Sequence, residues 1–229
     1  MLCRAQADVP TRELRLSIHG QLMVPLPHGA DVSGSMRARL RASTADLHAV
    51  VDARFAPMLG SGEAGYRSFL RASAAAVFAL EKALLAADVD AILPDWAQRA
   101  RTAALRADLA DLGVIDVPVA PPPLLAGEAR LFGALYVLEG SRLGAKLLLR
   151  ELLARGSSRV RAATRYLRHG EGRRLWPSFL AQLESSQATR RCPDDAIAGA
   201  RAAFALFVTG RAQAGPRPRV IAAETADAD

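Results

Sequence analysis

The sequence predicts an all-α protein, and three observations support that fold class. Alanine and leucine dominate a composition that is 51% hydrophobic and only 5% aromatic, and with arginine they are strong helix formers. Apolar residues recur at helical spacing, and no run alternates convincingly as a strand does. The helical segments follow one another with short breaks and no internal repeat. We therefore expect one all-α domain over about residues 36–210.

Both ends of the chain differ from this helical region. Residues 1–35 carry several prolines and glycines without a helical period, so we expect a disordered leader or a non-native extension. Residues 211–229 contain prolines and end in acidic residues, which predicts a disordered tail. The N-terminal stretch does not resemble a secretory signal, because Arg12, Glu13 and Arg15 interrupt any apolar segment.

Three helices are predicted in the first half of the helical region. The first covers about residues 36–56 and is ended by Pro57, since proline cannot donate a helical hydrogen bond. The second is an alanine-rich helix over about residues 65–87. A third helix follows a break at residues 90–95 and ends near Leu112, before a glycine suited to a C-cap.

The second half begins with a stiff, proline-rich loop over residues 113–123. A long helix is predicted from about 124 to 155, and a shorter one over 158–169 ends at a pair of glycines. Helical periodicity continues over about 175–187, and a proline opens a last helix over 193–209.

Charge and cysteine content limit the classes of function. The chain has 30 Lys and Arg against 23 Asp and Glu, a formal net charge of +7. The basic residues are interleaved with acidic ones, which favours a solvated surface over nucleic-acid binding. Cys3 and Cys192 lie near opposite ends, without metal-ligand spacing, so we expect a reducing, cytoplasmic compartment. No apolar run reaches the ~20 residues of a transmembrane helix, so we expect no membrane association.

Two glycines stand in the middle of the long predicted helix. Gly140 and Gly144 lie one turn apart, and each costs about 1 kcal/mol relative to alanine. They share a helical face with Gly133, Val137 and Ser141, so bulky side chains are absent from the middle of that face. Such a face permits a kink and close approach of a planar ligand, or tight helix packing through small residues, and both readings stay open.

One histidine lies on an apolar helical face. His48 stands between Leu47 and Val51 in the first helix, where it is either a core histidine or a ligand such as the imidazole that binds haem iron. Arg41 lies two helical turns earlier on the same face and could meet an acidic group of such a ligand. His169 lies at a predicted helix end, where we expect it to cap the helix as a cation.

Three segments resemble one known family. The stretch 135–145, LYVLEGSRLGA, resembles the distal helix of bacterial heme oxygenases, most of all those associated with bacteriophytochromes. The stretch 40–48, LRASTADLH, resembles the proximal helix of that family, and 166–179, YLRHGEGRRLWPSF, resembles its basic C-terminal region. The resemblance covers about residues 36–210 and implies a single-domain heme-oxygenase-like helical bundle with a kinked distal helix.

The resemblance implies roles for residues on the two faces of a bound haem. His48 would be the proximal iron ligand and the metal site. Gly140 and Gly144 would line the distal face, with Ser141 beside them as part of the catalytic surroundings. Members of the mammalian type carry an aspartate at the position of Ser141, and the family's second paired glycine is Ala145 here.

Basic residues would bind the haem propionates. Arg41 matches the basic position of the proximal helix, and Arg173 matches a propionate-facing residue near the C-terminal end, with Arg174 as its neighbour. Pro177 replaces a basic residue often found in this region, which weakens the expected propionate contact on that side.

The implied activity is oxidative cleavage of haem, which serves as both substrate and cofactor. The products would be biliverdin, ferrous iron and carbon monoxide, formed with O2 and external electrons. The sequence has no nucleotide-binding glycine motif and no iron–sulfur cysteine spacing, so a separate ferredoxin or reductase would donate the electrons. A bacteriophytochrome is a candidate acceptor of the biliverdin. Two alternatives are a non-catalytic haem-binding or haem-delivery protein and a haem-free helical relative of the thiamin-degrading type.

Overall fold

The structure, a computed structural model, describes residues 34–59, 61–117 and 120–209. The leader and tail expected at the two ends lie almost entirely outside these residues. The described residues form helices and contain no strand, as the sequence predicts. In chain order the elements are α1 Met36–Ser43, α2 Ala45–Leu59, α3 Gly62–Ala86, α4 Val89–Ile92, the 3-10 turn η2 Trp96–Gln98, α5 Thr102–Asp111, α6 Glu128–Arg155, α7 Ser158–Ala162, α8 Arg165–Arg168, α9 Leu175–Ser185, α10 Gln187–Arg191 and α11 Pro193–Thr209.

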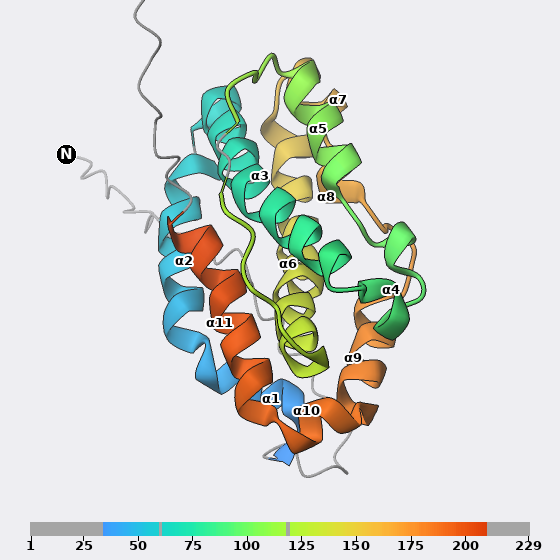
Figure 1. The fold of residues 1–229 in the computed structure, drawn as a ribbon. Helices are drawn as coiled ribbons and strands as arrows, with labels where there is room; N and C mark the ends of the chain where they lie inside the picture. Colours follow the sequence, from blue (N-terminus) through green and yellow to red (C-terminus); the bar gives the residue numbers. More distant parts are fainter. Residues whose placement is uncertain (1–33, 60, 118–119, 210–229) are drawn as a thin grey trace, which may run out of the picture.

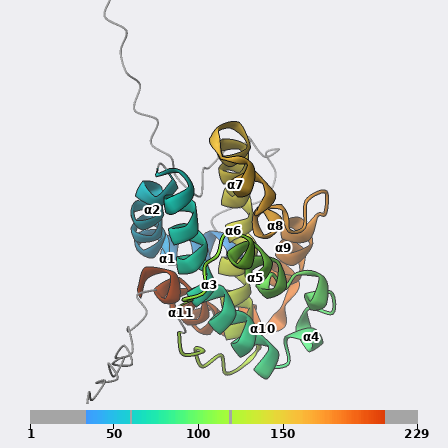
Figure 2. The ribbon, with the colours of Figure 1, turned by 90° about the horizontal axis from the view of Figure 1, so that it is seen from above.

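The long helix α6 lies at the centre of the bundle, with α2 and α11 on one side and α5, α8 and α9 on the other (Figures 1 and 2). Its most extensive partner is α11, and it also packs against α3, α8, α9 and α10. The helix α11 in turn contacts α1, α2 and α3. None of the helices that the structure describes is both long enough and apolar enough to cross a membrane.

Backbone-to-backbone packing joins the first half of α6 to the start of α11. A Cβ atom added to Gly133 would lie 1.9 Å from the Ala196 carbonyl oxygen, and one added to Gly199 would lie 2.1 Å from the Arg130 carbonyl oxygen. Only glycine permits this approach. Gly133 therefore permits tight packing of α6 against α11. This is one of the two explanations that the sequence analysis left open for the glycine-containing face, the other being close approach of a planar ligand.

The first predicted helix is in fact two helices, α1 and α2, separated at Thr44. The Thr44 side chain is buried, and its hydroxyl donates to the Leu40 carbonyl at 2.7 Å, a local bond that competes with helix continuation. Pro57 does not end α2, which continues to Leu59. A proline in the last turn leaves only one or two carbonyls without their helical partner, so the cost is small.

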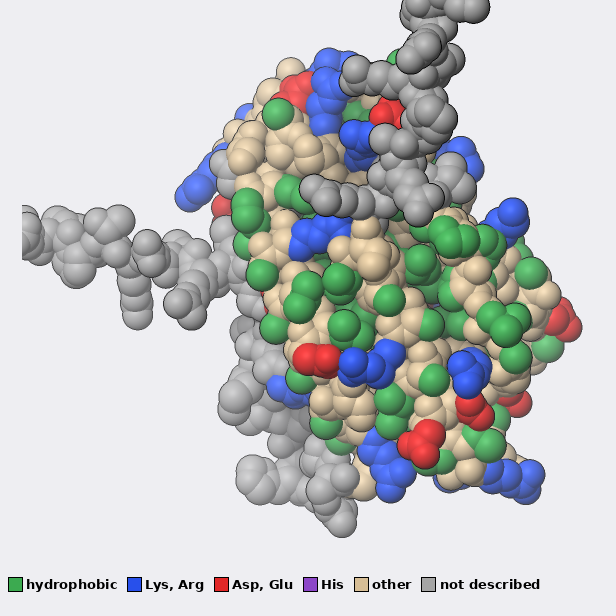
Figure 3. Space-filling view, turned by 60° about the vertical axis from the view of Figure 1, so that its left-hand side comes forward, with side chains coloured by type: hydrophobic (Ala, Val, Ile, Leu, Met, Phe, Trp, Pro, Cys, Tyr) green, Lys and Arg blue, Asp and Glu red, His purple; other side chains and the backbone are tan. Residues whose placement is uncertain are grey.

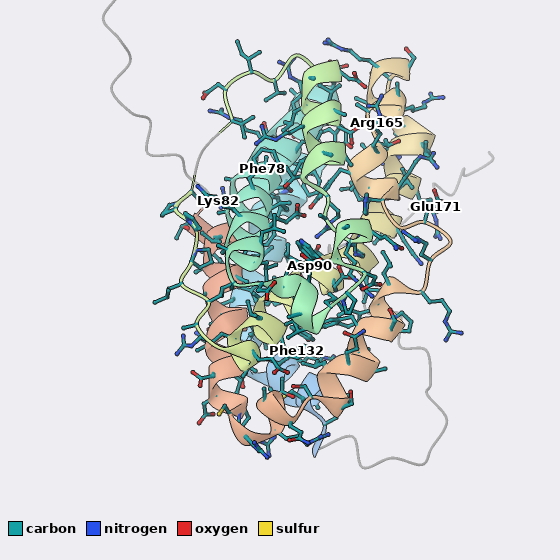
Figure 4. The ribbon with its side chains drawn as sticks, turned by 45° about the vertical axis from the view of Figure 1, so that its right-hand side comes forward. Phe78, Lys82, Asp90, Phe132, Arg165 and Glu171 are labelled. Carbon is teal, nitrogen blue, oxygen red and sulfur yellow. The ribbon has the colours of Figure 1, made fainter. Side chains whose placement is uncertain are left out.

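Two further boundaries differ from the predictions because carboxylates on distant helices cap them. The third predicted helix starts only at α5, since Glu81 accepts hydrogen bonds from the backbone N–H of Arg101 (2.7 Å) and Thr102 (3.0 Å). The segment 158–169 forms α7 and α8 separately, because Asp108 accepts from the N–H of Arg165 (3.1 Å) and Tyr166 (2.8 Å). Asp108 is fully buried and also pairs with the Arg165 guanidinium, which lies on the α8 side of the bundle (Figure 4).

Candidate functional site

An apolar cleft lies among α2, α3, α6, α8 and α11. Its cavity volume is about 40 Å³, so side chains fill most of the space between its walls in this structure. Its polar lining comes from two serines and a tyrosine, and the remaining side chains are hydrophobic or small. The lining residues are Val51, Phe55, Phe69, Ser73, Val137, Ser141, Gly144, Ala145, Leu148, Tyr166, Leu167, Phe204 and Phe207. The cleft is thus walled by apolar residues of α2 and α11 on one side and by the glycine face of α6 on the other.

The two central glycines of α6 meet different surroundings. Gly144 and Ser141 line the cleft, as the sequence leads one to expect for a ligand-facing surface. Gly140 lies beside the cleft and faces α9, where an added Cβ atom would meet the Trp176 indole ring at 3.7 Å. That distance is ordinary van der Waals contact, so Gly140 marks the place where Trp176 packs against α6.

His48 stands beside the cleft on α2. It lies one turn before Val51, a lining residue, and its ring centroid is 5.6 Å from that of Phe204, another lining residue. Its Nδ1 atom is 3.4 Å from a carboxylate oxygen of Asp52, one turn later on α2. The side chain is 32% exposed, which does not fit a core histidine. The structure therefore places an imidazole with a carboxylate neighbour at the edge of an apolar space.

A buried arginine, Arg101, lies behind the polar part of the α6 wall. Its Nη2 donates to the Leu138 carbonyl at 2.8 Å and to the Ser141 hydroxyl at 2.9 Å, and its guanidinium lies 5.1 Å from the centroid of the Tyr166 ring. The Ser141 hydroxyl donates its own hydrogen to the Leu138 carbonyl at 2.7 Å. Ser141 therefore faces the cleft as a hydrogen-bond acceptor beside a fixed positive charge.

Behind this wall, Glu139 binds two arginines on the side of α6 opposite Ser141. Its carboxylate lies 2.9 Å from Arg99 Nη1 and 2.8 Å from Arg142 Nη2, and Glu139 is fully buried. Arg99 also pairs with Asp95 at 2.7 Å and donates to the Leu175 carbonyl at 2.9 Å. We refer to Asp95, Arg99, Glu139 and Arg142 as the buried ion cluster. It ties α6 to η2 and to the start of α9.

His169 extends the buried ion cluster but is not a charged helix cap. Its Nδ1 lies 3.1 Å from Arg142 Nη1, and arginine is only a donor, so Nδ1 is the acceptor. Burial, and then the positive charge of Arg142, lower the pKa of His169 to about 4. The prediction of a cationic cap at this helix end is therefore wrong, because the side chain is neutral at pH 7.

Two arginines of α1 lie near Tyr136 on α6. Burial raises the pKa of Tyr136, and the charges of Arg37 and Arg41 act against that rise. The Tyr136 ring is 5.7 Å from the Trp176 ring, over which the Arg37 guanidinium lies at 6.0 Å. Arg41 is exposed on α1 near Tyr136, and the break at Thr44 separates it from His48 on α2, so the two residues do not lie two turns apart on one helix as predicted.

Arg173 and Arg174 lie in the segment between α8 and α9. Both are exposed, and neither lines the cleft. Arg173 donates a hydrogen bond to the Gln98 side chain of η2, and the Arg174 carbonyl accepts from the Ser178 N–H at 3.0 Å, at the start of α9. The structure thus brings together His48, Ser141 and Gly144 around the cleft, while Arg173 and Arg174 are tied to η2 and α9.

Sequence reasoning missed four residues of this region: Asp52, Arg101, Arg37 and Trp176. Asp52 had a detectable signal, since it follows His48 by one helical turn, and so did Arg37, which precedes Arg41 by one turn. Arg101 and Trp176 reach α6 from distant segments of the chain, and no local pattern indicates those contacts. Among the described residues there is no group of three or more His, Cys, Asp or Glu that could bind a metal ion.

The basic residues on the visible surface do not gather into one patch. In Figure 3 the Lys and Arg side chains are scattered among acidic and apolar ones on the face shown. On this face the basic residues form no continuous patch of the kind that binds nucleic acid.

Comparison with known proteins identifies the family. No family model matches the chain. A heme oxygenase of Xanthomonas campestris pv. campestris is 40% identical over 114 residues, which cover 50% of this chain and 68% of that protein. The heme oxygenase PigA of Pseudomonas aeruginosa is 38% identical over 122 residues, which cover 51% of this chain and 60% of that protein. The NO- and CO-bound heme oxygenase from Neisseria meningitidis superposes with a TM-score of 0.61 and 27% identity, over 77% of this chain and 90% of that chain. The chain belongs to the heme oxygenase family.

Proposed function

We propose that this protein is a heme oxygenase that cleaves haem to biliverdin, ferrous iron and carbon monoxide, using O2 and electrons from a separate donor. The observation that carries the proposal is the imidazole of His48 at the edge of an apolar cleft whose opposite wall is the glycine-containing helix α6. The residues fit haem by their chemistry: apolar walls suit the porphyrin ring, an imidazole suits iron, and cations on α1 suit the propionates.

His48 is the proposed iron ligand. A metal-bound histidine commonly directs its second ring nitrogen to a carboxylate, which fixes the ring and raises its basicity. Asp52 lies 3.4 Å from Nδ1 and suits that role, so iron would be bound through Nε2. Haem, when bound, supplies the oxidative chemistry, and the protein supplies ligation, orientation and control of water.

The α6 wall would control the other face. Gly144 has no side chain, so the backbone of α6 stays close to a planar ligand lying in the cleft. Ser141 can hold a water molecule as an acceptor, because its own hydrogen is directed to the Leu138 carbonyl. Arg101 fixes the Ser141 oxygen and adds a positive charge that stabilises negative charge developing nearby. Ser141 and Gly144 are thus the proposed catalytic surroundings, and Gly140 lies beside them against Trp176.

The remaining assignments belong to the same proposal. Arg41 is the proposed propionate contact on α1, with Arg173 and Arg174 as further basic residues. We also propose that the protein belongs to the bacteriophytochrome-associated group of heme oxygenases and works in the cytoplasm. A ferredoxin or reductase is the proposed electron donor, and a bacteriophytochrome is the proposed acceptor of biliverdin. The distal-helix motif supports membership of this group, and the net charge of +7 suits an acidic electron donor.

The experiment is a hemin titration followed by reduction in air. A Soret band that saturates at one hemin per chain, and its replacement by the biliverdin spectrum with ascorbate or a ferredoxin system, are the expected results. Stable haem binding without biliverdin would indicate a haem-delivery protein instead. No Soret change would favour a haem-free relative of the thiamin-degrading type, although Cys192 is exposed and does not line the cleft.

A further inference from the structure

A groove separate from the cleft lies between the start of α3 and the loop after α5. In Figure 1 this loop crosses from the end of α5 to the start of α3. The lining comes from α3 between residues 63 and 71 and from residues 113–116 of the loop, and we refer to it as the α3 groove. Its cavity volume is about 570 Å³, against about 40 Å³ for the cleft. A volume of this size is within the range of small-molecule sites.

The α3 groove and the cleft lie on opposite faces of α3. Phe69 and Ser73, one turn apart, line the cleft, whereas Arg67 and Arg71, also one turn apart, line the groove. With 3.6 residues per turn, the two pairs point roughly 160° apart around the helix axis. The groove is therefore a site of its own and not the outer mouth of the cleft.

Two arginines of the groove keep hydrogen-bond donors available. Arg67 Nη2 donates to the Gly113 carbonyl at 3.3 Å, and within the described ranges Arg67 forms no ion pair. Arg71 Nη2 lies 2.5 Å from a carboxylate oxygen of Asp116, which is 82% exposed, and the buried Arg71 Nε has no partner in the part of the chain that the structure describes. Exposed ion pairs contribute little, so another carboxylate can replace that of Asp116 at small cost.

The loop adds an apolar surface beside these cations. Ile115 is 97% exposed, more than any other large hydrophobic residue that the structure describes, and the half-buried Val114 and Ala64 line the same groove. Glu63, the second acidic residue of the lining, pairs with Arg159 at 3.5 Å. Among the described residues that line the groove there is no His, Cys, Met or Tyr, so the groove offers haem iron none of its usual ligands.

We propose that the α3 groove binds biliverdin, with Arg67 and Arg71 bound to its two propionate carboxylates and Ile115 covered by its apolar rings. The inference rests on the proposed function, which forms a product of this chemistry. Helical residues one turn apart have Cβ atoms about 5–6 Å apart, so the two arginines can reach neighbouring carboxylates. Guanidinium and carboxylate groups form strong paired hydrogen bonds. An opened tetrapyrrole can follow an open groove and needs no metal ligand there.

The test is a titration of biliverdin, by equilibrium dialysis without reductant, into protein already saturated with hemin. We expect one biliverdin per wild-type chain. Arg67→Gln combined with Arg71→Gln should weaken biliverdin binding by about tenfold or more, because charge-assisted hydrogen bonds are lost, and should leave hemin affinity unchanged. Arg161→Gln is the matched control, since Arg161 is exposed on α7 and does not line the groove. Biliverdin dimethyl ester, which lacks the two charges, should bind the wild type as weakly as the double variant.

A second pair of variants tests the apolar contact without affecting the core. Ile115→Asp should weaken biliverdin binding by about tenfold, because it removes an apolar contact and places a negative charge beside the carboxylates. Leu124→Asp is its control, since Leu124 is 85% exposed and outside the groove. If the hemin-loaded wild type binds no biliverdin, or if the double variant and Ile115→Asp bind it as the wild type does, this inference is overturned alone. A wild type that neither binds hemin nor forms biliverdin overturns the proposed function and this inference with it.

Discussion

The two walls of the cleft are held in different ways. Behind the α6 wall, Arg99, Arg101 and Glu139 are each at most 2% exposed. Arg99 pairs with Glu139 at 2.9 Å and with Asp95 at 2.7 Å. Arg101 donates hydrogen bonds of 2.8 and 2.9 Å to the Leu138 carbonyl and the Ser141 hydroxyl of α6. The polar contacts of α2 with α11 are exposed at one end and partly buried at the other. Arg201 of α11 binds Asp46 at 3.0 Å, and Arg54 donates to the carbonyls of Phe207 and Val208 at the end of α11.

This difference concerns how strongly polar contacts hold each wall. Breaking a buried ion pair leaves an uncompensated charge in the interior and costs far more than loss of an exposed pair. The polar contacts of the helix that carries His48 are therefore weaker than those of α6, and α2 is held mainly by the burial of Val51 and Phe55 in the core.

The largest expected effect is on the buried ion cluster. Glu139→Ala leaves Arg99 and Arg142 buried without their shared carboxylate, which should lower the free energy of unfolding by about 3–5 kcal/mol. Urea denaturation measures it. Glu151→Ala is the matched control on α6, since the Glu151 partner is an exposed arginine at 3.8 Å, and it should leave the urea midpoint unchanged. Equal midpoints for the two variants would mean that the buried ion cluster does not stabilise α6 more than an exposed ion pair does.

The second effect is a loss of stability in acid through His169. Its pKa is lowered to about 4 in the folded protein from 6.5, so the unfolded chain binds more protons between these values. The contribution of neutral His169 to the free energy of unfolding is therefore fully present above pH 6.5. It is lost as the pH falls towards 4, and the loss is about 2 kcal/mol after allowance for partial exposure. Unfolding midpoints from pH 7 to 4 measure it. His169→Gln should show a smaller decrease, and an identical pH profile for the variant would contradict the assignment.

The smallest effect is expected at the surface contact of the α2 wall. Arg201→Ala removes the ion pair with Asp46 and the hydrogen bond to the Ser43 carbonyl, both of which are exposed. The urea midpoint should stay close to that of the wild type, because exposed ion pairs contribute little and are screened by salt. A loss as large as that of Glu139→Ala would mean that both walls are equally fixed.

The sequence predicts the fold class and several elements because helical periodicity is local. The last helix, for example, agrees with α11 at both ends. The boundaries that failed depend on tertiary contacts: Glu81 and Asp108 cap helices that begin about 20 to 57 residues later in the chain. The helix propensity of a segment contains no information about capping carboxylates on other helices.

The same distinction holds for the site. His48 and Gly144 are recoverable from their own helices, since each occupies a recognisable place on a helical face. Arg101 and Trp176 act through contacts with α6 that join residues about 40 positions apart in sequence. The neutral state of His169 likewise depends on its burial and on Arg142, 27 residues earlier, and no local pattern indicates either.

The most direct test of His48 as the iron ligand is the iron–histidine stretch in the resonance Raman spectrum of the ferrous haem complex. We predict that the wild type shows this band, that His48→Ala loses it, and that added imidazole restores both the band and biliverdin formation. Unchanged haem ligation in His48→Ala would contradict the central claim that iron is bound from the α2 side of the cleft.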